Sequence, residues 1–193
     1  LDAEKYVKAQ AEFSFVLSSG TGTDYGDDAQ FFLAEAYFLN DQFLLSITEY
    51  ENLTRKMAFS PFFEKSRFRI CEAFRIESPD YYNDQSYTEK ALERYIEFLD
   101  DFPDSEYSQT VTESMSILRN KLSKKLYETG ILYLKMDEFE PARMSFNNAL
   151  DQYYDTDIID HVHVGIIKSF IQEKNIDQAK EYWLNKGQEH IVR

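Results

Sequence analysis

Two stretches of the chain repeat one pattern of small and aromatic residues at a constant offset of 96 positions. The first stretch carries Ala34, Tyr37, Phe43, Ser46, Tyr50 and Leu53, and the second carries Gly130, Tyr133, Phe139, Ala142, Phe146 and Ala149. In both, apolar residues recur every three or four positions, which is the period of an amphipathic helix. Polar turn residues interrupt each stretch, at Asn40–Gln42 and at Asp137–Glu138. The repeated unit is therefore predicted to be a hairpin of two helices, about 34 residues long.

This pattern has a packing explanation. Small residues let two helix backbones approach closely, and aromatic side chains fill the grooves beside them. One hairpin cannot bury its own apolar face, so such hairpins stack on their neighbours to form a solenoid. The spacing resembles the tetratricopeptide repeat (TPR), a helical hairpin with small residues at its eighth and twentieth positions.

Further copies follow the same register with less regular lengths. In a central copy, Cys71 and Phe74 take the small and aromatic places of a first helix. Its second helix carries Ala91, Tyr95 and Phe98 and closes at Phe102–Pro103. Cys71 and Ala91 are 20 residues apart, against 12 in the regular copies, so 8 residues are inserted between them. A helix break is expected at Ser78–Asp80, because proline disfavours a helical residue before it.

The ends and a long middle segment complete the array. A lone second helix is predicted from Ala9, Phe13 and Val16, and a degenerate last hairpin from Gly165 and Ala179–Trp183. Surplus residues before the fourth copy are predicted to form one long helix near Ser105 to Lys135, capped by Asp104 or Ser105. The predicted fold is an all-α, TPR-type solenoid of about four hairpins plus a half, forming a single array over residues 1–193.

Charge and composition exclude several classes of protein. A net charge of −14 repels phosphate backbones, so we expect no nucleic-acid partner and no non-specific adhesion to an anionic membrane. Hydrophobic residues make up 43% of the chain, which is enough for a sizeable core. The single cysteine excludes an internal disulfide framework and a cysteine-based zinc site. Since the chain starts at Leu1, we expect the natural N-terminus, with any targeting signal, to precede it.

Histidine and cysteine side chains do not form an evident metal or catalytic site. His161 and His163 are two positions apart, so on a helix they point about 200° away from each other. We therefore favour structural or solvated histidines over metal ligands. Cys71 stands where the hairpin requires a small residue, so a buried hydrophobic role is favoured over a reactive thiol.

The loop Gly20–Asp28 contains Asp24, Asp27 and Asp28, which are potential Ca²⁺ ligands. The loop does not match the ligand ladder of an EF-hand, so we favour a turn with Asp27 or Asp28 near the N-cap of the next helix. The chain has no serine in a Gly-x-Ser-x-Gly elbow, and no carboxylate pair stands out. We predict no catalytic residue, no metal, no cofactor and no enzymatic activity.

The first helices of TPR hairpins face the concave groove of the solenoid. The register places there Phe31, Glu35, Phe38 and Leu39 of the second hairpin, Lys65, Phe68, Glu72 and Arg75 of the third, and Lys124, Tyr127, Ile131 and Lys135 of the fourth. An aromatic groove rimmed by charge suits an extended peptide or a partner helix. For Phe31 and Phe38, packing between neighbouring hairpins is an equal alternative. Chaperone-binding TPRs carry Lys and Asn where Phe31 and Glu35 stand here, which disfavours that sub-class.

A second candidate surface is the inserted segment after the third hairpin's first helix. It contains Tyr81, Tyr82 and Tyr87 together with Asp80 and Asp84. Tyrosine is enriched in protein interfaces, so these residues are a candidate protein contact. Folding of the segment back over its own hairpin is the alternative.

Four short stretches resemble the BamD (ComL) family of outer-membrane assembly lipoproteins, which are TPR proteins. They are Asp84–Gln85 with Thr88 and Ala91; Phe102–Ser105 with Tyr107; Leu118–Leu122; and Leu132–Lys135 with Asp155–Thr156. The insertion in the third hairpin and the long fused helix also fit that family. The family's lipidated cysteine is not in this chain, and its usual Tyr-Pro before Asp-Thr is Tyr153–Tyr154 here.

The resemblance implies a non-catalytic scaffold at the periplasmic face of the bacterial outer membrane, held there by a lipid anchor. The implied partners are a BamA-like barrel-forming subunit, other assembly lipoproteins and unfolded outer-membrane proteins. The alternative is a TPR adaptor, periplasmic or cytoplasmic, that binds a peptide or protein in another pathway.

Overall fold

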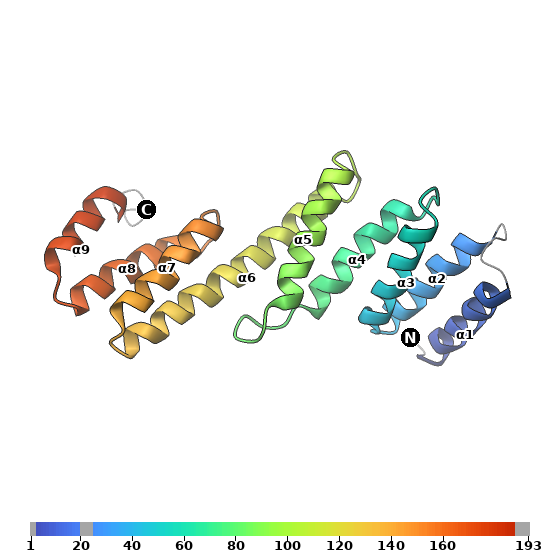
Figure 1. Cartoon of the computed structure of the whole chain (residues 1–193), viewed down its shortest axis with the longest axis horizontal. Helices are drawn as coiled ribbons and strands as arrows, with labels where there is room; N and C mark the ends of the chain where they lie inside the picture. Colours follow the sequence, from blue (N-terminus) through green and yellow to red (C-terminus); the bar gives the residue numbers. More distant parts are fainter. Residues whose placement is uncertain (1–2, 20–24, 188–193) are drawn as a thin grey trace. The chain divides into compact units, whose positions relative to one another are not determined.

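The computed structural model describes residues 3–19 and 25–187, and every regular element within them is helical (Figure 1). The α-helices are α1 (Ala3–Ser19), α2 (Gly26–Leu39), α3 (Phe43–Lys56), α4 (Phe63–Glu77), α5 (Ser86–Asp101), α6 (Ser108–Lys135), α7 (Phe139–Tyr153), α8 (Ile159–Gln172) and α9 (Ile176–Tyr182). A short π-helical turn, Trp183–Gly187, follows α9. The all-α, TPR-like prediction is confirmed. Among the described residues, no helix combines the length and apolar character needed to span a bilayer.

The chain forms two compact units. The N-terminal unit comprises Leu1–Pro79 and Asp84–Met115, and the C-terminal unit comprises Asp80–Asn83 and Ser116–Arg193. Helices that follow one another in the sequence pack as pairs, such as α2 with α3, α4 with α5 and α7 with α8. The single array over residues 1–193 remains a prediction.

Three connections between successive helices have the same form. Each leaves three residues between the helices, and the central residue has a positive φ, at Asp41, Asp137 and Lys174. In the first of them, the Gln42 N–H donates to the Tyr37 carbonyl at 2.9 Å, and the other two repeat this bond. This Schellman ending satisfies carbonyls that the helix end leaves unpaired. The turns predicted at Asn40–Gln42 and Asp137–Glu138 are confirmed.

From α2 to α8, the small positions of the repeat and the aromatic position four residues after the small residue of each second helix are buried in both units, whereas Tyr37, Phe43, Tyr133 and Phe139 are half-buried. The fully buried set in the N-terminal unit, with no more than 1% exposure, includes Ala34, Ser46, Tyr50, Cys71, Ala91, Tyr95 and Phe98. Burial raises the pKa of the Cys71 thiol to about 12, which fits a small hydrophobic residue rather than a reactive one. The predicted register of the hairpins is therefore the register of the core.

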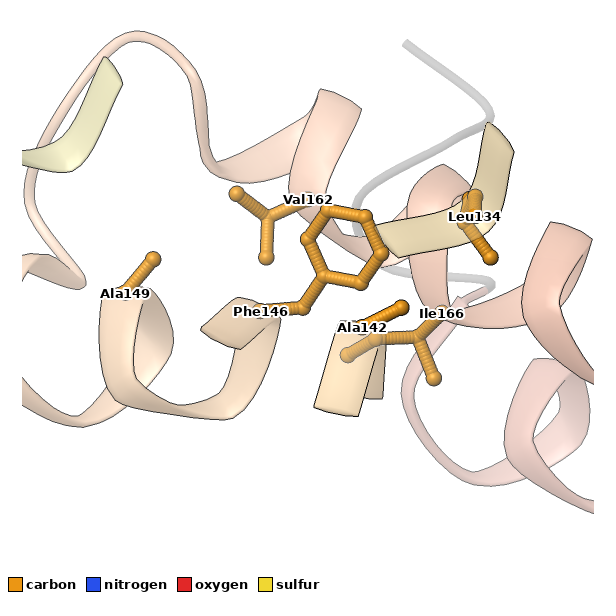
Figure 2. Packing of buried hydrophobic residues seen from close by; sticks show 6 residues of the cluster. All are labelled: Leu134, Ala142, Phe146, Ala149, Val162 and Ile166. Carbon is orange, nitrogen blue, oxygen red and sulfur yellow. The ribbon is translucent and has the colours of Figure 1, made fainter. Parts of the chain in front are cut away.

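The core of the C-terminal unit surrounds the ring of Phe146 (Figure 2). Its buried neighbours are Leu134, Ala142, Ala149, Val162 and Ile166. A Cβ atom added to Gly165 would lie 2.7 Å from the tip of the ring, and one added to Gly130 would lie closer still. Glycine at both places therefore makes room for one aromatic ring between helices.

The long helix begins later than predicted. α6 spans 28 residues and starts at Ser108, three residues after the expected Ser105. Ser105 instead closes a turn ahead of the helix, where its hydroxyl accepts the Tyr107 N–H at 3.1 Å and donates to Glu64 at 2.5 Å. Ser105 therefore holds the connection between α5 and α6 and does not cap α6.

Replacing Gly130 by alanine is expected to lower the free energy of unfolding by about 1–3 kcal/mol, because the new methyl group collides with Phe146. At an ordinary helix position the same change raises stability by about 1 kcal/mol, so the sign is informative. Urea unfolding followed by circular dichroism measures it. The cost should shrink in a Phe146→Leu background, and a Gly130→Ala chain as stable as the parent would contradict this packing.

Candidate functional site

The predicted groove residues divide between the two units. The groove residues of the second and third hairpins, from Phe31 to Arg75, lie on α2 and α4 of the N-terminal unit. Those of the fourth hairpin lie on α6 in the C-terminal unit: Lys124, Tyr127, Ile131 and Lys135. Whether these residues bind a partner remains a prediction.

Glu35 on α2 is held by residues from two other helices, α3 and α4. Its carboxylate accepts two hydrogen bonds from the Arg69 guanidinium on α4, at 2.7 and 3.0 Å, and one from the Tyr50 hydroxyl on α3. The same guanidinium lies 4.6 Å from the centre of the Phe38 ring, as a cation–π contact. Arg69 is not among the predicted groove residues, although it stands four residues after Lys65 and three before Glu72 on one helical face.

Glu72 on α4 repeats this arrangement one hairpin later. It accepts hydrogen bonds from Arg75 at 3.1 and 2.7 Å and from the Tyr95 hydroxyl on α5. Burial pushes the Glu72 pKa up, but the hydrogen bonds from Arg75 and Tyr95 outweigh it and hold the pKa below its ordinary value. Burial raises the pKa of Tyr95, and Glu72 adds to the rise, so the phenol stays protonated as a donor.

The C-terminal unit has an apolar version of the same pair. Counted from the small residues of each hairpin, Phe146 stands where Tyr50 and Tyr95 stand, and Ile131 stands where Glu35 and Glu72 stand. Where the ring lacks a hydroxyl, the first helix supplies no carboxylate. The acid in the N-terminal unit is therefore explained as the acceptor that a buried phenol needs.

The charges predicted for the groove of the N-terminal unit are largely used inside that unit. The Glu35 and Glu72 side chains are only 14% and 13% exposed, and both are ion-paired. Phe31 is buried against Phe62, with ring centres 4.4 Å apart, so it contributes to packing between hairpins. Leu39 is 51% exposed and offers apolar surface at the end of α2.

The groove residues predicted on α4 also include Phe68, which is half-buried, and Lys65, which is exposed. Phe68 stacks on Tyr107 with ring centres 4.3 Å apart, so its ring also holds the connection that precedes α6. The Lys65 ammonium lies 5.2 Å from the centre of the Phe31 ring, and Lys65 is otherwise exposed. Lys65 is exposed and Arg75 is half-exposed, so both cations are accessible on this face.

In the C-terminal unit, α6 and the inserted segment come together. The Lys124 ammonium lies 4.5 Å from the centre of the Tyr81 ring, and Lys125 donates to the carbonyl of Asn83 at 2.6 Å. Tyr81 and Tyr82 pack edge to face, and Tyr82 is 68% exposed. Lys124 is predicted for the groove and Tyr81 for a separate surface on the inserted segment, but the two side chains are in contact and form one surface.

The placement of Tyr87 in the inserted segment is wrong. α5 begins at Ser86, so Tyr87 lies in the first turn of that helix, where its ring stacks near Phe74 with centres 6.3 Å apart.

The other groove residues predicted on α6 differ in exposure. Tyr127 lies beside Phe146 and His161, while Ile131 is partly buried and Lys135 is exposed.

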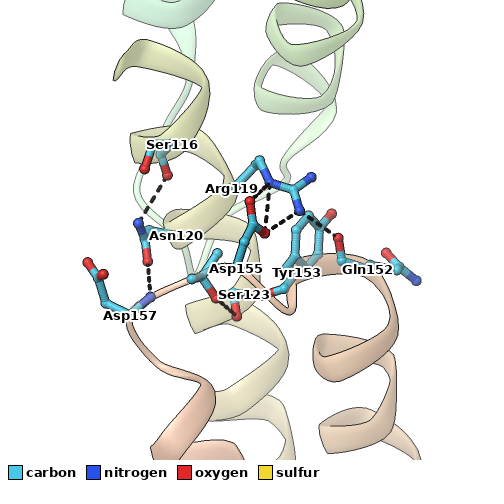
Figure 3. Close-up of polar contacts among 9 residues, drawn as sticks. Ser116, Arg119, Asn120, Ser123, Gln152, Tyr153, Asp155 and Asp157 are labelled. Carbon is cyan, nitrogen blue, oxygen red and sulfur yellow. Dashed lines mark hydrogen bonds and ion pairs between the residues drawn. The ribbon is translucent and has the colours of Figure 1, made fainter. Parts of the chain in front are cut away.

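Two of the family-like stretches hold each other in the C-terminal unit (Figure 3). Arg119 donates to both carboxylate oxygens of Asp155 and, at 3.1 Å, to the Gln152 carbonyl. Asn120 accepts the Asp157 N–H at 2.9 Å, and the hydroxyls of Thr156 and Ser123 are 2.9 Å apart. The hydrogen bond from Arg119 lowers the Asp155 pKa. These residues fasten the connection between α7 and α8 to α6.

The stretch around Thr88 fastens another connection in the N-terminal unit. The Thr88 hydroxyl is 2.6 Å from that of Ser78 and donates to the Gln85 side chain at 2.8 Å. α4 ends just before, at Glu77, so the helix break predicted at Ser78–Asp80 is confirmed. The family-like residues in this stretch thus hold a connection in place.

The histidine and aspartate residues considered as metal ligands do not form a common site in the part of the chain that the structure describes. His163 is buried and its Nδ1 is 2.8 Å from the Tyr182 hydroxyl, whereas His161 is exposed. Asp27 and Asp28 lie within the first turn of α2, while Gly20, Gly22 and Asp24 lie outside the described residues. Within residues 3–19 and 25–187, no three histidine, cysteine or acidic side chains gather as a metal site.

The pairing of Tyr95 with Glu72 predicts a non-additive double mutant. Tyr95→Phe should lower the free energy of unfolding by about 1–2 kcal/mol, because a partly buried carboxylate loses a donor. Tyr95→Phe combined with Glu72→Ile copies the pair of Phe146 and Ile131 and should cost less than the two changes summed. Urea unfolding at neutral pH measures the cycle, and additive costs would show that the two residues are not coupled.

Glu72 also predicts a pH dependence. Because its pKa is lowered in the folded chain, its contribution to stability is complete above the ordinary value of 4.5 and is lost as pH falls through the lowered pKa. The parent chain should therefore lose more stability on acidification than the Tyr95→Phe/Glu72→Ile chain. Unfolding midpoints measured across acidic pH test this, and equal losses would contradict it.

Comparison with known proteins identifies the family to which the chain belongs. A family model described as an outer membrane lipoprotein, YfiO, matches residues 1–183. The chain is 23% identical over 189 residues to "Outer membrane protein assembly factor BamD" of Rickettsia prowazekii (strain Madrid E), covering 94% of this chain and 72% of that protein. The match spans nearly the whole helical chain, and the resemblance seen in the sequence is confirmed: the chain belongs to the YfiO family of outer membrane lipoproteins.

Proposed function

We propose that this chain is a non-catalytic scaffold of the machinery that assembles β-barrel proteins into the bacterial outer membrane. The observation that carries the proposal is the family match over residues 1–183. The similar protein from Rickettsia prowazekii is named an outer membrane protein assembly factor. The packed helix pairs support a scaffold, because stacked hairpins present extended surfaces to partners.

The best-placed carboxylates of the N-terminal unit have structural roles, which supports a non-catalytic function. Glu35 and Glu72 are each held by an arginine and a tyrosine hydroxyl, so their oxygens are occupied by fixed donors. The lowered pKa of Glu72 keeps it ionised at neutral pH, which is unsuited to a general acid. Cys71, buried with a raised pKa, is unsuited to nucleophilic attack.

The partners that we propose are a BamA-like barrel-forming subunit, other assembly lipoproteins and unfolded barrel proteins. The face of α2 and α4 supports binding of an extended segment, since it combines apolar Leu39 with the cations Lys65 and Arg75. The ion pairs beneath that face fix its shape before a partner arrives, which lowers the ordering cost of binding. The location that we propose is the periplasmic face of the outer membrane, through a lipid anchor.

Site-specific photo-crosslinking at Leu39 tests this function. Ile96 on α5 is the matched control, because it is 50% exposed against 51% for Leu39 and lies on a second helix of the same unit. In outer-membrane preparations, a crosslinker at Leu39 should capture the barrel-forming subunit or unfolded barrel proteins more often than one at Ile96. Depletion of the protein should lower the amount of folded barrel proteins in the outer membrane. Normal barrel assembly after depletion would overturn the proposal.

A further inference from the structure

α1 is a second helix of the repeat, and no described helix precedes it as the first helix of its hairpin. Ala9, Phe13 and Val16 stand at the three core positions of a second helix in the register of the repeat. α1 packs on α2, the first helix of the following hairpin, and lies at the end of the N-terminal unit (Figure 1). One side of α1 therefore has a partner helix, and the other side is the subject of this inference.

The three core positions are completely closed in the other second helices that belong to regular hairpins. In α3, α5 and α7 all of them have 0% exposure: Ser46, Tyr50, Leu53, Ala91, Tyr95, Phe98, Ala142, Phe146 and Ala149. On α1, by contrast, Val16 is 38% exposed, and Ala9 and Phe13 are half-buried. Apolar surface that the repeat buries everywhere else is thus open to water on α1, at a cost in free energy.

A ring at the central core position is covered from two sides. The Phe146 ring lies between Gly130 of its own first helix and Gly165 of the next first helix. Phe13 has the second kind of neighbour, because it stacks on Phe32 of α2 with ring centres 5.9 Å apart. The side that stays open is the one on which a first helix covers the ring in the other hairpins. The repeat itself therefore says what kind of element covers this face.

Another position of the same helices shows that α1 is open on this one face. The residue two places before the small residue is exposed in all of these second helices, at Leu44, Glu89 and Glu140. On α1 this place belongs to Val7, which is 55% exposed. The register thus leaves Val7 in water in any case, whereas it buries the position of Val16.

We propose that the open face of α1, formed by Ala9, Phe13 and Val16, binds an amphipathic helix formed by the stretch of the natural protein that precedes Leu1. In the four hairpins that the described residues form, the first helix lies upstream of its second helix, with three to eight residues between the two. A helix joined so closely has a high effective concentration at the face, which favours it over a helix from another molecule. The proposal goes beyond the scaffold role and does not depend on it.

The ring at the central position also indicates what the covering helix carries. Phe13 has no hydroxyl, as Phe146 has none, and the first helix that covers Phe146 presents Gly130 followed by Ile131. We therefore expect a small residue against Phe13, which lets the helices approach closely, and no carboxylate beside it. Burial of Phe13 and Val16 under this helix supplies the free energy that holds it.

Hydrogen exchange followed by mass spectrometry tests this face of α1. Two purified proteins without lipid are compared, the chain of residues 1–193 and the natural protein that includes the stretch before Leu1. Val16→Asp places a charge under the proposed helix, where its burial is unfavourable. Val7→Asp is the matched control, because it makes the same change on the same helix at a position that the register leaves exposed.

The backbone amides of α1 should exchange more slowly in the longer protein than in the 1–193 chain, because a covered helix opens less often. In the longer protein, Val16→Asp should abolish this slowing and Val7→Asp should preserve it. In the 1–193 chain the two changes should have equal, small effects, and circular dichroism should show both variants helical, since both sites are exposed. Val16→Ala, which adds no charge, should weaken the slowing in the same direction and serves if Val16→Asp prevents folding.

Equal exchange of α1 in the two proteins, or equal effects of Val16→Asp and Val7→Asp in the longer protein, would overturn the proposal. Slowing that increases with protein concentration would also overturn it, because it would assign the face to a second copy of the chain. The samples contain neither membrane nor assembly partner, so the outcome is independent of the depletion experiment.

Discussion

The structure depends on one contact, an aromatic ring of a second helix packed against a small residue of a first helix. It is clearest at Phe146, whose ring fills the space that Gly130 and Gly165 leave between helices. Tyr50 and Tyr95 occupy the same place in the register and are completely buried. A ring of this size requires the helix backbones to approach closely on either side of it, so the small residues, the helix pairing and the burial of the core follow from it.

The ring at this position also explains where charge lies in the N-terminal unit. A buried phenol needs an acceptor, which Glu35 and Glu72 provide, and a partly buried carboxylate in turn needs a cation, which Arg69 and Arg75 provide. Phe146 has no hydroxyl, and this chain of requirements does not arise in the C-terminal unit. The two carboxylates that suggested a charged groove, Glu35 and Glu72, are thus part of the packing, whereas Lys65 stays exposed.

The stretches that resemble the family serve the connections between helices. Arg119 and Asn120 bind the segment that follows α7, and Thr88 binds Ser78, the first residue after α4. Such contacts join residues that are far apart in the sequence but fixed in number by the hairpin geometry. Their order along the chain therefore carries the family likeness more strongly than any one of them.

The sequence by itself determined the helices, their pairing, the turns at Asp41 and Asp137 and the core register, because helical period and residue size act over a few neighbouring positions. It left open whether Phe31 packs or binds, and it missed Arg69, the start of α6 and the helical position of Tyr87. Only the tertiary structure decided these, because each depends on which side chains of other helices come within reach. Arg69 meets Glu35 across 34 residues and Ser105 meets Glu64 across 41, distances along the chain at which no local pattern reports a contact.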